Sequence, residues 1–302
     1  MATITERVTV RKPHPRRRAA GSFDEMHVKP WTRFARHLIV IAIGAIMMYP
    51  LLWLLAASFK PDADIFSSLS IWPSEWDFSH YTDAWTALEK PFQVFLLNSL
   101  LLAVLSIVGN LISCGMAAYA FSRLDFRGRK FMFALMLSTL MLPSQVLLVP
   151  QYVIFAQLGW LNTYLPLLVP TFLATNAFFI FLMVQFMRAL PRELDDAARI
   201  DGCGSFGIFF RIIVPLCMPA FATTAIFTFI GSWNEFFGPL LYLTNQDLYT
   251  VPLALKQFMN TEGQSSWGQI FAMSVVSLAP VVGFFLAGQK YLINGIATTG
   301  LK

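Results

Sequence analysis

Long apolar runs separated by short polar segments make up most of the chain from residue 38 onward. A helix that crosses a membrane needs roughly 20 consecutive, mostly apolar residues. The longest uncharged stretch, 131–187, has room for two such helices joined by a polar turn near Gly159–Thr163. The pattern therefore predicts an all-α membrane protein with six spanning helices, at residues 38–59, 95–120, 131–150, 165–187, 214–236 and 269–289.

Several prolines fall within or at the ends of these predicted helices, at positions 50, 143, 150, 170, 219 and 280. Each of them should kink its helix. A helix bundle in lipid tolerates such kinks because neighbouring helices satisfy the freed backbone groups.

The composition agrees with a surface that is largely covered by lipid. Only 13% of the residues are charged and 56% are hydrophobic, whereas a soluble domain carries about 25% charged residues. The formal net charge of +5 could suggest a nucleic-acid partner. The positive residues lie between the apolar runs rather than on one folded face, so we expect no nucleic-acid binding.

The distribution of lysine and arginine predicts the orientation of the chain. With the N-terminus inside, the cytoplasmic segments hold nineteen of these residues, of which nine precede the first helix. The opposite side holds three, Lys60, Lys90 and Lys256. Because Lys and Arg are enriched in cytoplasmic loops, both termini are predicted to be cytoplasmic. Residues 1–36 are then a basic cytoplasmic tail, too long for a cleaved signal peptide, and 37–302 form the transmembrane domain.

The sequence offers no basis for catalysis or for a metal site. Its cysteines, at positions 114, 203 and 217, form no CxxC pair, and its four histidines show no HxxxH spacing. An ATPase needs a phosphate-binding GxxxxGK[ST] loop, yet no lysine follows a glycine in this chain. Ion-driven carriers bury ionisable residues at mid-membrane. Glu235 is the one acid within a long apolar region, and it lies at the outer end of the fifth predicted helix.

The cytoplasmic loop 188–211 is the most informative segment. Pro191 and the acids after it suit the start of a helix, and Gly202 suits its end, so we predict a helix of about ten residues. Leu194, Ala197, Ala198 and Asp201 share one face of it by their spacing. The helix could dock in a cleft of another protein, with its alanines allowing close approach, or it could rest on the membrane surface.

The same loop resembles the signature of ABC-importer permeases. Asp196-Ala197-Ala198 precedes Gly202 by three residues, and Ile212-Ile213-Val214-Pro215 follows nine residues later. Asp stands for the family's Glu and Val for its Leu. The resemblance extends through SWNEFFGPL at 232–240 and QKYLINGI at 289–296. The chain is similar to the carbohydrate-uptake branch, and in particular to the smaller permease of maltose-type transporters.

This resemblance implies a type I ABC importer permease fold in the bacterial inner membrane and a multi-subunit assembly. The partners would be a homologous second permease, two cytoplasmic ATPase subunits that bind ATP and Mg, and an extracytoplasmic solute-binding protein. The cargo would be a carbohydrate, and this subunit would need no cofactor. The residues expected to couple transport to the ATPase are Glu193, Leu194, Asp196, Ala197, Ala198, Asp201 and Gly202.

Polar residues within the predicted helices are the candidates for a substrate path, because amides both donate to and accept from sugar hydroxyls. The same residues could instead hold helices together, at about 0.6–2 kcal/mol each. The candidates are Asn98, Asn110, Gln145, Asn176, Trp233, Asn234 and Glu235. The lack of basic residues within the helices argues against an anionic substrate. By resemblance, the expected contacts to the solute-binding protein are Gln257, Asn260, Glu262 and Ser266.

Two alternatives remain open from the residues alone. The chain could be an ATP-independent channel or secondary transporter for a small polar solute, or a membrane scaffold that transports nothing. Solute flux through the purified chain without ATP would indicate a channel or carrier. Intact uptake after loss of 188–211 would indicate a scaffold. The sequence does not specify which carbohydrate is carried.

Overall fold

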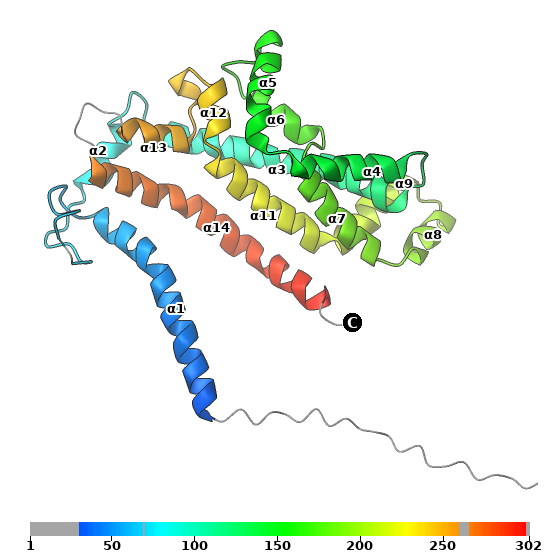
Figure 1. Cartoon of the computed structure of the whole chain (residues 1–302), viewed down its shortest axis with the longest axis horizontal. Helices are drawn as coiled ribbons and strands as arrows, with labels where there is room; N and C mark the ends of the chain where they lie inside the picture. Colours follow the sequence, from blue (N-terminus) through cyan, green and yellow to red (C-terminus); the bar gives the residue numbers. More distant parts are fainter. Residues whose placement is uncertain (1–29, 69, 260–265, 300–302) are drawn as a thin grey trace, which may run out of the picture. The chain divides into compact units, whose positions relative to one another are not determined.

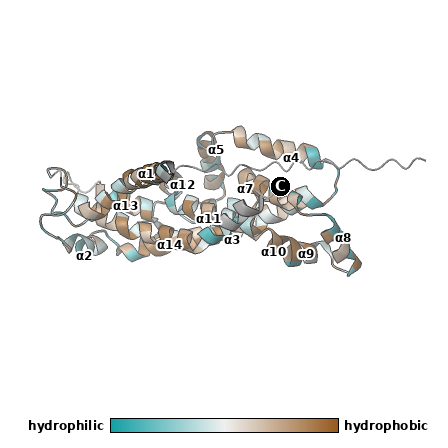
Figure 2. Ribbon diagram, turned by 90° about the horizontal axis from the view of Figure 1, so that it is seen from below, coloured by the Kyte–Doolittle hydropathy of each residue, from teal (hydrophilic) through white to brown (hydrophobic). Residues whose placement is uncertain are grey.

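The computed structural model describes residues 30–68, 70–259 and 266–299. It divides into two compact units, 1–50 and 51–302. The described part of the first unit belongs to α1 (Pro30–Ala57), a helix composed mainly of apolar residues. Most of the remaining helices in Figure 2 are apolar along much of their length, as expected for helices that contact lipid.

The described residues form helices joined by turns and loops, the longest of which, between α1 and α2, includes residues 58–78, and this confirms the all-α prediction (Figure 1). The longer elements of the second unit are α2 (Ser79–Thr86), α3 (Phe92–Arg123), α4 (Arg129–Ser138), α5 (Ser144–Gln157), α6 (Leu165–Phe172), α7 (Ala177–Ala189), α8 (Glu193–Ile200), α11 (Met218–Asn234), α12 (Phe237–Tyr242), α13 (Val251–Met259) and α14 (Trp267–Thr299). The shorter elements are two 3₁₀ turns (Thr139–Met141, Gln246–Leu248), α9 (Ser205–Ile208), a π-helix (Phe209–Ile213) and α10 (Val214–Leu216).

Four helical segments in the described residues are long and apolar enough to cross a membrane, and two bent pairs raise the number to six. The predicted first, second and sixth spans correspond to the continuous helices α1, α3 and α14. The predicted fourth span corresponds to α6 and α7, with a break at 173–176. The third and fifth spans are the bent pairs.

The third predicted span was wrong as a single helix over 131–150. The chain instead turns by 106° between Arg129–Met141 and Gln145–Gln157. Pro143 causes the break, because proline has no N–H to donate and disfavours helical geometry in the preceding residue. Leu142 accordingly has extended dihedral angles, φ −85° and ψ 122°.

The fifth predicted span also needs correction, because its helix begins later than residue 214. The segments Ser205–Leu216 and Met218–Trp233 meet at an angle of 80°. Pro215 and Pro219 occupy the first turns of α10 and α11, where proline is tolerated because the first N–H groups have no helical partner. The predicted polar turn before the fourth span is confirmed, with Gly159 at φ +69° and Asn162 at φ +59°.

Helix α3 is the centre of the second unit and packs against α6, α7 and α11, while α11 also packs against α14. Small residues allow this approach. A Cβ added to Gly109 would lie 2.5 Å from the Thr171 hydroxyl and 2.9 Å from the Phe172 ring. Close backbone packing of this kind is how helices associate in lipid, where the hydrophobic effect contributes little between them.

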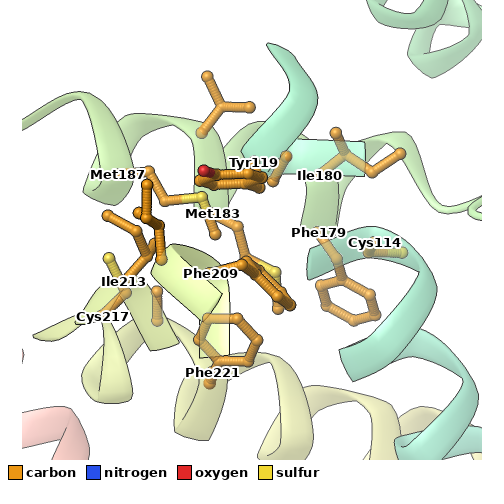
Figure 3. Close-up of a cluster of buried hydrophobic side chains, with 14 of the residues drawn as sticks. Cys114, Tyr119, Phe179, Ile180, Met183, Met187, Phe209, Ile213, Cys217 and Phe221 are labelled. Carbon is orange, nitrogen blue, oxygen red and sulfur yellow. The ribbon is translucent and has the colours of Figure 1, made fainter. Parts of the chain in front are cut away.

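Two apolar clusters occupy opposite ends of this packing. One lies around Phe92, Phe95 and Phe229, and α2, α13 and the start of α14 complete it. The other joins the end of α3 to α7 and to the segment before α11. Figure 3 shows the second cluster, with Cys114, Tyr119, Phe179, Ile180, Met183, Met187, Phe209, Ile213, Cys217 and Phe221.

Candidate coupling helix and substrate cavity

The predicted cytoplasmic helix exists as α8, which spans eight residues, Glu193–Ile200, rather than about ten. Its first turn carries three acids, Glu193, Asp195 and Asp196, and its last turn carries Arg199. This arrangement stabilises the helix, because negative charge is favourable at the N-terminus and positive charge at the C-terminus. An ion pair between Arg199 and Asp196 at 3.3 Å adds support on the exposed surface.

The helix ends at Gly202, as predicted. Gly202 has φ +82°, a conformation that residues with a Cβ adopt at a cost. The Gly202 N–H donates to the Arg199 carbonyl at 3.0 Å, and the Cys203 N–H donates to the Ala198 carbonyl at 2.9 Å. These two bonds form a Schellman motif. A Cβ at Gly202 would meet no other atom within 4 Å, so the requirement for glycine comes from the backbone alone.

The face of α8 that the sequence assigned to a partner is only partly available. Ala197 is exposed, Leu194 is 37% exposed, and Asp201 is also exposed. Ala198 is 5% exposed and belongs to the apolar cluster beneath the helix. The expectation that both alanines face a partner is therefore wrong for Ala198, whose small side chain lets α8 lie close to its own chain.

A buried ion pair attaches α8 to the helix bundle. Asp195, 4% exposed, receives a hydrogen bond from Nη1 of Arg123 at 3.2 Å, and Arg123 is the last residue of α3. The same guanidinium donates to the carbonyls of Met187, Leu190 and Pro191, at the end of α7 and just beyond it. Arg123 therefore joins α3, α7 and α8 at one point.

Sequence reasoning missed this contact. From the sequence, Arg123 is only one of the nineteen basic residues that indicate orientation, and Asp195 is only one of the acids that follow Pro191. Sequence spacing could not pair two residues that lie 72 positions apart. Removal of one partner of a buried ion pair typically costs about 3–5 kcal/mol, because the other charge is left buried without compensation.

A cavity of about 300 Å³ lies among α3, α6, α7 and α11, between the two apolar clusters. Its walls carry hydroxyl and amide side chains and one acid. The polar residues that line it are Ser106, Asn110, Thr171, Asn176, Thr228, Ser232 and Glu235. Three predicted path residues, Asn110, Asn176 and Glu235, are thus brought together with four others that the sequence did not single out.

Hydrogen bonds hold several of these side chains in place. Asn110 donates through Nδ2 to the Thr228 hydroxyl at 3.3 Å, which joins α3 to α11. Asn176 accepts from the Phe179 N–H at 3.2 Å and caps the start of α7. Glu235 accepts from the Gly238 N–H at 2.9 Å just after α11 ends. Each group keeps further hydrogen-bonding capacity, so the cavity wall can still bind a polar ligand.

The other predicted path residues do not line this cavity. Asn98 donates through Nδ2 to the carbonyls of Asp247 and Tyr249, at 2.8 and 3.0 Å, and so has a structural role. Beside it, Lys90 Nζ lies 2.8 Å from Asp247 Oδ1, and this hydrogen bond raises the pKa of Lys90 and lowers that of Asp247. Gln145 is exposed on α5.

Trp233 and Asn234 line a different cavity, of about 400 Å³, together with residues of α13 and α14. Trp233 is only 3% exposed and stacks on Phe229 with ring centroids 5.5 Å apart. The indole face is therefore used within the chain. Asn234 donates to the Ile230 carbonyl of its own helix at 2.9 Å.

The predicted contacts to a solute-binding protein fall in and after α13. Gln257 is half-buried on α13, and Ser266 is half-buried immediately before α14. Asn260 and Glu262 lie outside the described residues.

Comparison with known proteins agrees with this architecture. The family model described as binding-protein-dependent transport system inner membrane component matches residues 109–296. The probable ABC transporter permease protein YurM of Bacillus subtilis is 36% identical, over 90% of this chain and 87% of that protein. The arabinooligosaccharides transport system permease protein AraQ of Halalkalibacterium halodurans is 35% identical, over 86% of this chain and 93% of that protein.

Further relatives include the trehalose/maltose transport system permease protein MalG of Thermococcus litoralis, which is 32% identical over 87% of this chain and 96% of that protein. A chain in the crystal structure of a bacterial ABC transporter that imports the acidic polysaccharide alginate has the same fold. Its TM-score is 0.74 at 24% identity, covering 85% of this chain and 95% of that chain. The resemblance that the signature loop indicated is confirmed. The chain belongs to the binding-protein-dependent transport system inner membrane components, as a multi-pass ABC transporter permease of the inner membrane.

Proposed function

We propose that this permease moves an uncharged carbohydrate into the cytoplasm, driven by separate ATPase subunits. The observation that carries the proposal is the connection from α8 to the polar cavity. Arg123 binds Asp195 of α8 at one end of α3, and the same helix α3 contributes Ser106 and Asn110 to the cavity wall.

In this mechanism the ATPase binds the exposed face of α8, around Leu194, Ala197 and Asp201. Its closure on ATP moves α8. The buried pair Arg123–Asp195 and the carbonyls at the end of α7 carry that displacement to α3 and α7. Because both helices line the cavity, their movement alters the side from which the cavity is open. Gly202, with its positive φ, would keep α8 in the orientation that the ATPase requires.

The assembly would include a homologous second permease, two ATPase subunits that hold ATP and Mg, and an extracytoplasmic solute-binding protein. A related alginate transporter has been solved in complex with a pentasaccharide-bound periplasmic protein, with a TM-score of 0.57 to this chain at 16% identity, covering 85% of this chain and 92% of that chain. In this proposal the solute-binding protein docks on the outer side near Gln257 and Ser266, and both termini lie in the cytoplasm.

The cavity lining favours an uncharged cargo. Hydroxyl and amide groups suit sugar hydroxyls, and Glu235 is the single charged residue among those that line the cavity. An anionic sugar would meet this carboxylate without a cation to offset it. The names of AraQ and MalG refer to arabinooligosaccharides and to trehalose and maltose, which supports a neutral oligosaccharide here.

Substitution of Gly202 tests the coupling in the complete transporter. Gly202→Val places a β-branched residue at φ +82°, which costs about 1–3 kcal/mol. Gly202→Asn is the matched control, because asparagine tolerates this conformation better. We expect Gly202→Val to lose most ATP-driven uptake in proteoliposomes while Gly202→Asn retains most of it. Equal uptake by the two variants would contradict the proposed role of α8.

The alternative of a channel or secondary carrier has a separate test. The purified chain alone, reconstituted in liposomes with a panel of labelled sugars, should show no flux above protein-free liposomes. ATP-dependent uptake should appear only when the ATPase and the solute-binding protein are present. Rapid flux through the chain alone would favour the channel instead.

A further inference from the structure

A further cavity, of about 340 Å³, has a polar lining and lies near α8. It is formed where α3 and α7 end and where α4 begins. Four arginines line it: Arg123, Arg129, Arg188 and Arg192. They come from four separate segments, the end of α3, the start of α4, the end of α7 and the residue before α8. Figure 1 shows α4, α7 and α8 at the same end of the second unit. This cavity shares no lining residue with the cavity of about 300 Å³ among α3, α6, α7 and α11.

The positive charge in this cavity is only partly neutralised. Arg123 pairs with Asp195, and Arg129 pairs with Asp125 at 2.6 Å. Among the described residues, neither Arg188 nor Arg192 has a carboxylate within 4.0 Å. The site therefore presents two uncompensated guanidinium groups, which favour an anion with several oxygen acceptors.

Arg188 is exposed, and its guanidinium lies against an aromatic ring. Its guanidinium carbon lies 5.0 Å from the centroid of the Phe133 ring on α4. A cation over an aromatic face is an attractive arrangement, and this contact joins the end of α7 to α4 beside the cavity. Arg129 is held by a second bond, to the Leu124 carbonyl at 2.7 Å.

Exposed apolar side chains follow Arg129, which lines this cavity, along α4. On α4, Phe131 is 72% exposed, Met132 is 52% exposed and Leu135 is 57% exposed. The cavity thus combines positive charge with the exposed apolar surface of α4, which begins just after the connection 124–128. A free anion would use the charge alone, whereas a phospholipid would use the charge and the apolar surface.

We propose that this cavity binds the phosphate of an anionic phospholipid from the cytoplasmic leaflet, with the acyl chains lying along α4. Basic pockets between membrane helices on the cytoplasmic side bind anionic headgroups by this chemistry. Arginine is suited to the task because its fork donates two parallel hydrogen bonds to phosphate oxygens. The lipid would stabilise the junction of α3, α4 and α7 beside α8.

The test compares two double variants of the full-length purified chain. Arg188→Gln/Arg192→Gln removes the uncompensated charges of the cavity. Arg127→Gln/Lys290→Gln removes the same number of positive charges from positions that do not line it. Retention of phosphatidylglycerol relative to phosphatidylcholine, measured by native mass spectrometry from mixed micelles, should fall at least about tenfold only in the cavity variant. This expectation follows from about 1 kcal/mol per basic residue near the headgroup.

Two further measurements keep the proposal open to refutation. Arg188→Lys/Arg192→Lys keeps the charge and should retain much of the preference for phosphatidylglycerol, which would exclude a general folding defect. Inorganic phosphate is the probe for a free anion. Tight phosphate binding by the wild-type chain without any preference for phosphatidylglycerol would overturn the proposal, as would an equal loss in both glutamine variants. Weakened binding of the ATPase with unchanged lipid retention would assign these arginines to the subunit interface instead.

Discussion

At the scale of single residues, the contact between Arg123 and Asp195 determines how α8 is attached to the bundle. Both side chains are buried, and each keeps one atom, Arg123 Nε and Asp195 Oδ1, without a hydrogen-bond partner among the described residues. An ion pair in this setting contributes less to stability than its charges suggest, because both groups lose their hydration. Its value is specificity, since the pair is satisfied only when α8 occupies one position relative to α3.

Removal of one partner should therefore be far more harmful than removal of both. We expect Arg123→Met to lower the free energy of unfolding by about 3–5 kcal/mol, because Asp195 is left buried without a countercharge. Adding Asp195→Leu should recover much of that loss. Thermal unfolding of the detergent-solubilised wild-type, single and double variants measures the effect. Strictly additive losses in the double variant would show that the two side chains do not depend on each other.

Several residues behaved as the sequence indicated, for local reasons. Gly202 ends α8 because its φ is positive, and the acids of the first turn of α8 are where the helix dipole favours them. The burial of Ala198 and Trp233 could not be predicted from the sequence. Whether such a side chain faces a partner or its own core depends on tertiary packing, and both turned out to be buried.

At the scale of elements, helix α3 shows how a polar cavity can be built inside an apolar bundle. Its two ends contribute to the apolar clusters, and its middle carries Ser106 and Asn110. Helix α11 has the same apolar–polar–apolar pattern but meets the two clusters in the opposite order, with Phe221 before Thr228 and Trp233 after it. Matching polar positions on two packed helices thus open a cavity at the level between the two clusters.

Filling this cavity should block transport without unfolding the protein. Gly231 lines the cavity on α11, and a Cβ there would meet no atom within 4 Å. We expect Gly231→Leu to reduce sugar uptake at least about tenfold, because its side chain occupies space that the sugar needs, while stability stays within about 1 kcal/mol. Gly283→Leu on α14 is the matched control, since that glycine also has open space around it.

Uptake by Gly231→Leu equal to that of Gly283→Leu, in proteoliposomes that contain the whole transporter, would show that the cavity is not on the path of the sugar. A loss of uptake in both variants would point to a general effect of leucine on the bundle.

The positions of apolar spans were predictable because length and hydropathy are local properties, but their bends were less so. Pro50 and Pro280 lie inside α1 and α14, which remain continuous helices. Pro143 precedes a turn of 106°. The difference depends on which neighbouring groups satisfy the freed carbonyls, and that information is absent from a single segment.

At the scale of the whole molecule, the chain combines two surfaces with different tasks. The exposed residues of α8 would receive force from an ATPase, and the polar cavity among α3, α6, α7 and α11 would hold the cargo. Between them lies the apolar cluster of Figure 3, which joins α3 to α7 and to the segment before α11. Because packed cores resist gradual deformation, such a cluster suits the transfer of a displacement from one surface to the other.

If α8 is the point at which an ATPase acts on this chain, its exposed face must touch that subunit. A photoreactive amino acid at position 197, incorporated into the assembled transporter in inside-out vesicles, tests it directly. We expect a cross-link to the nucleotide-hydrolysing subunit, and none from the same probe at Leu97, an exposed residue in the predicted membrane-spanning part of α3. A cross-link from position 197 to an extracytoplasmic protein, or no cross-link to the ATPase in a transporter that still performs ATP-driven uptake, would contradict it.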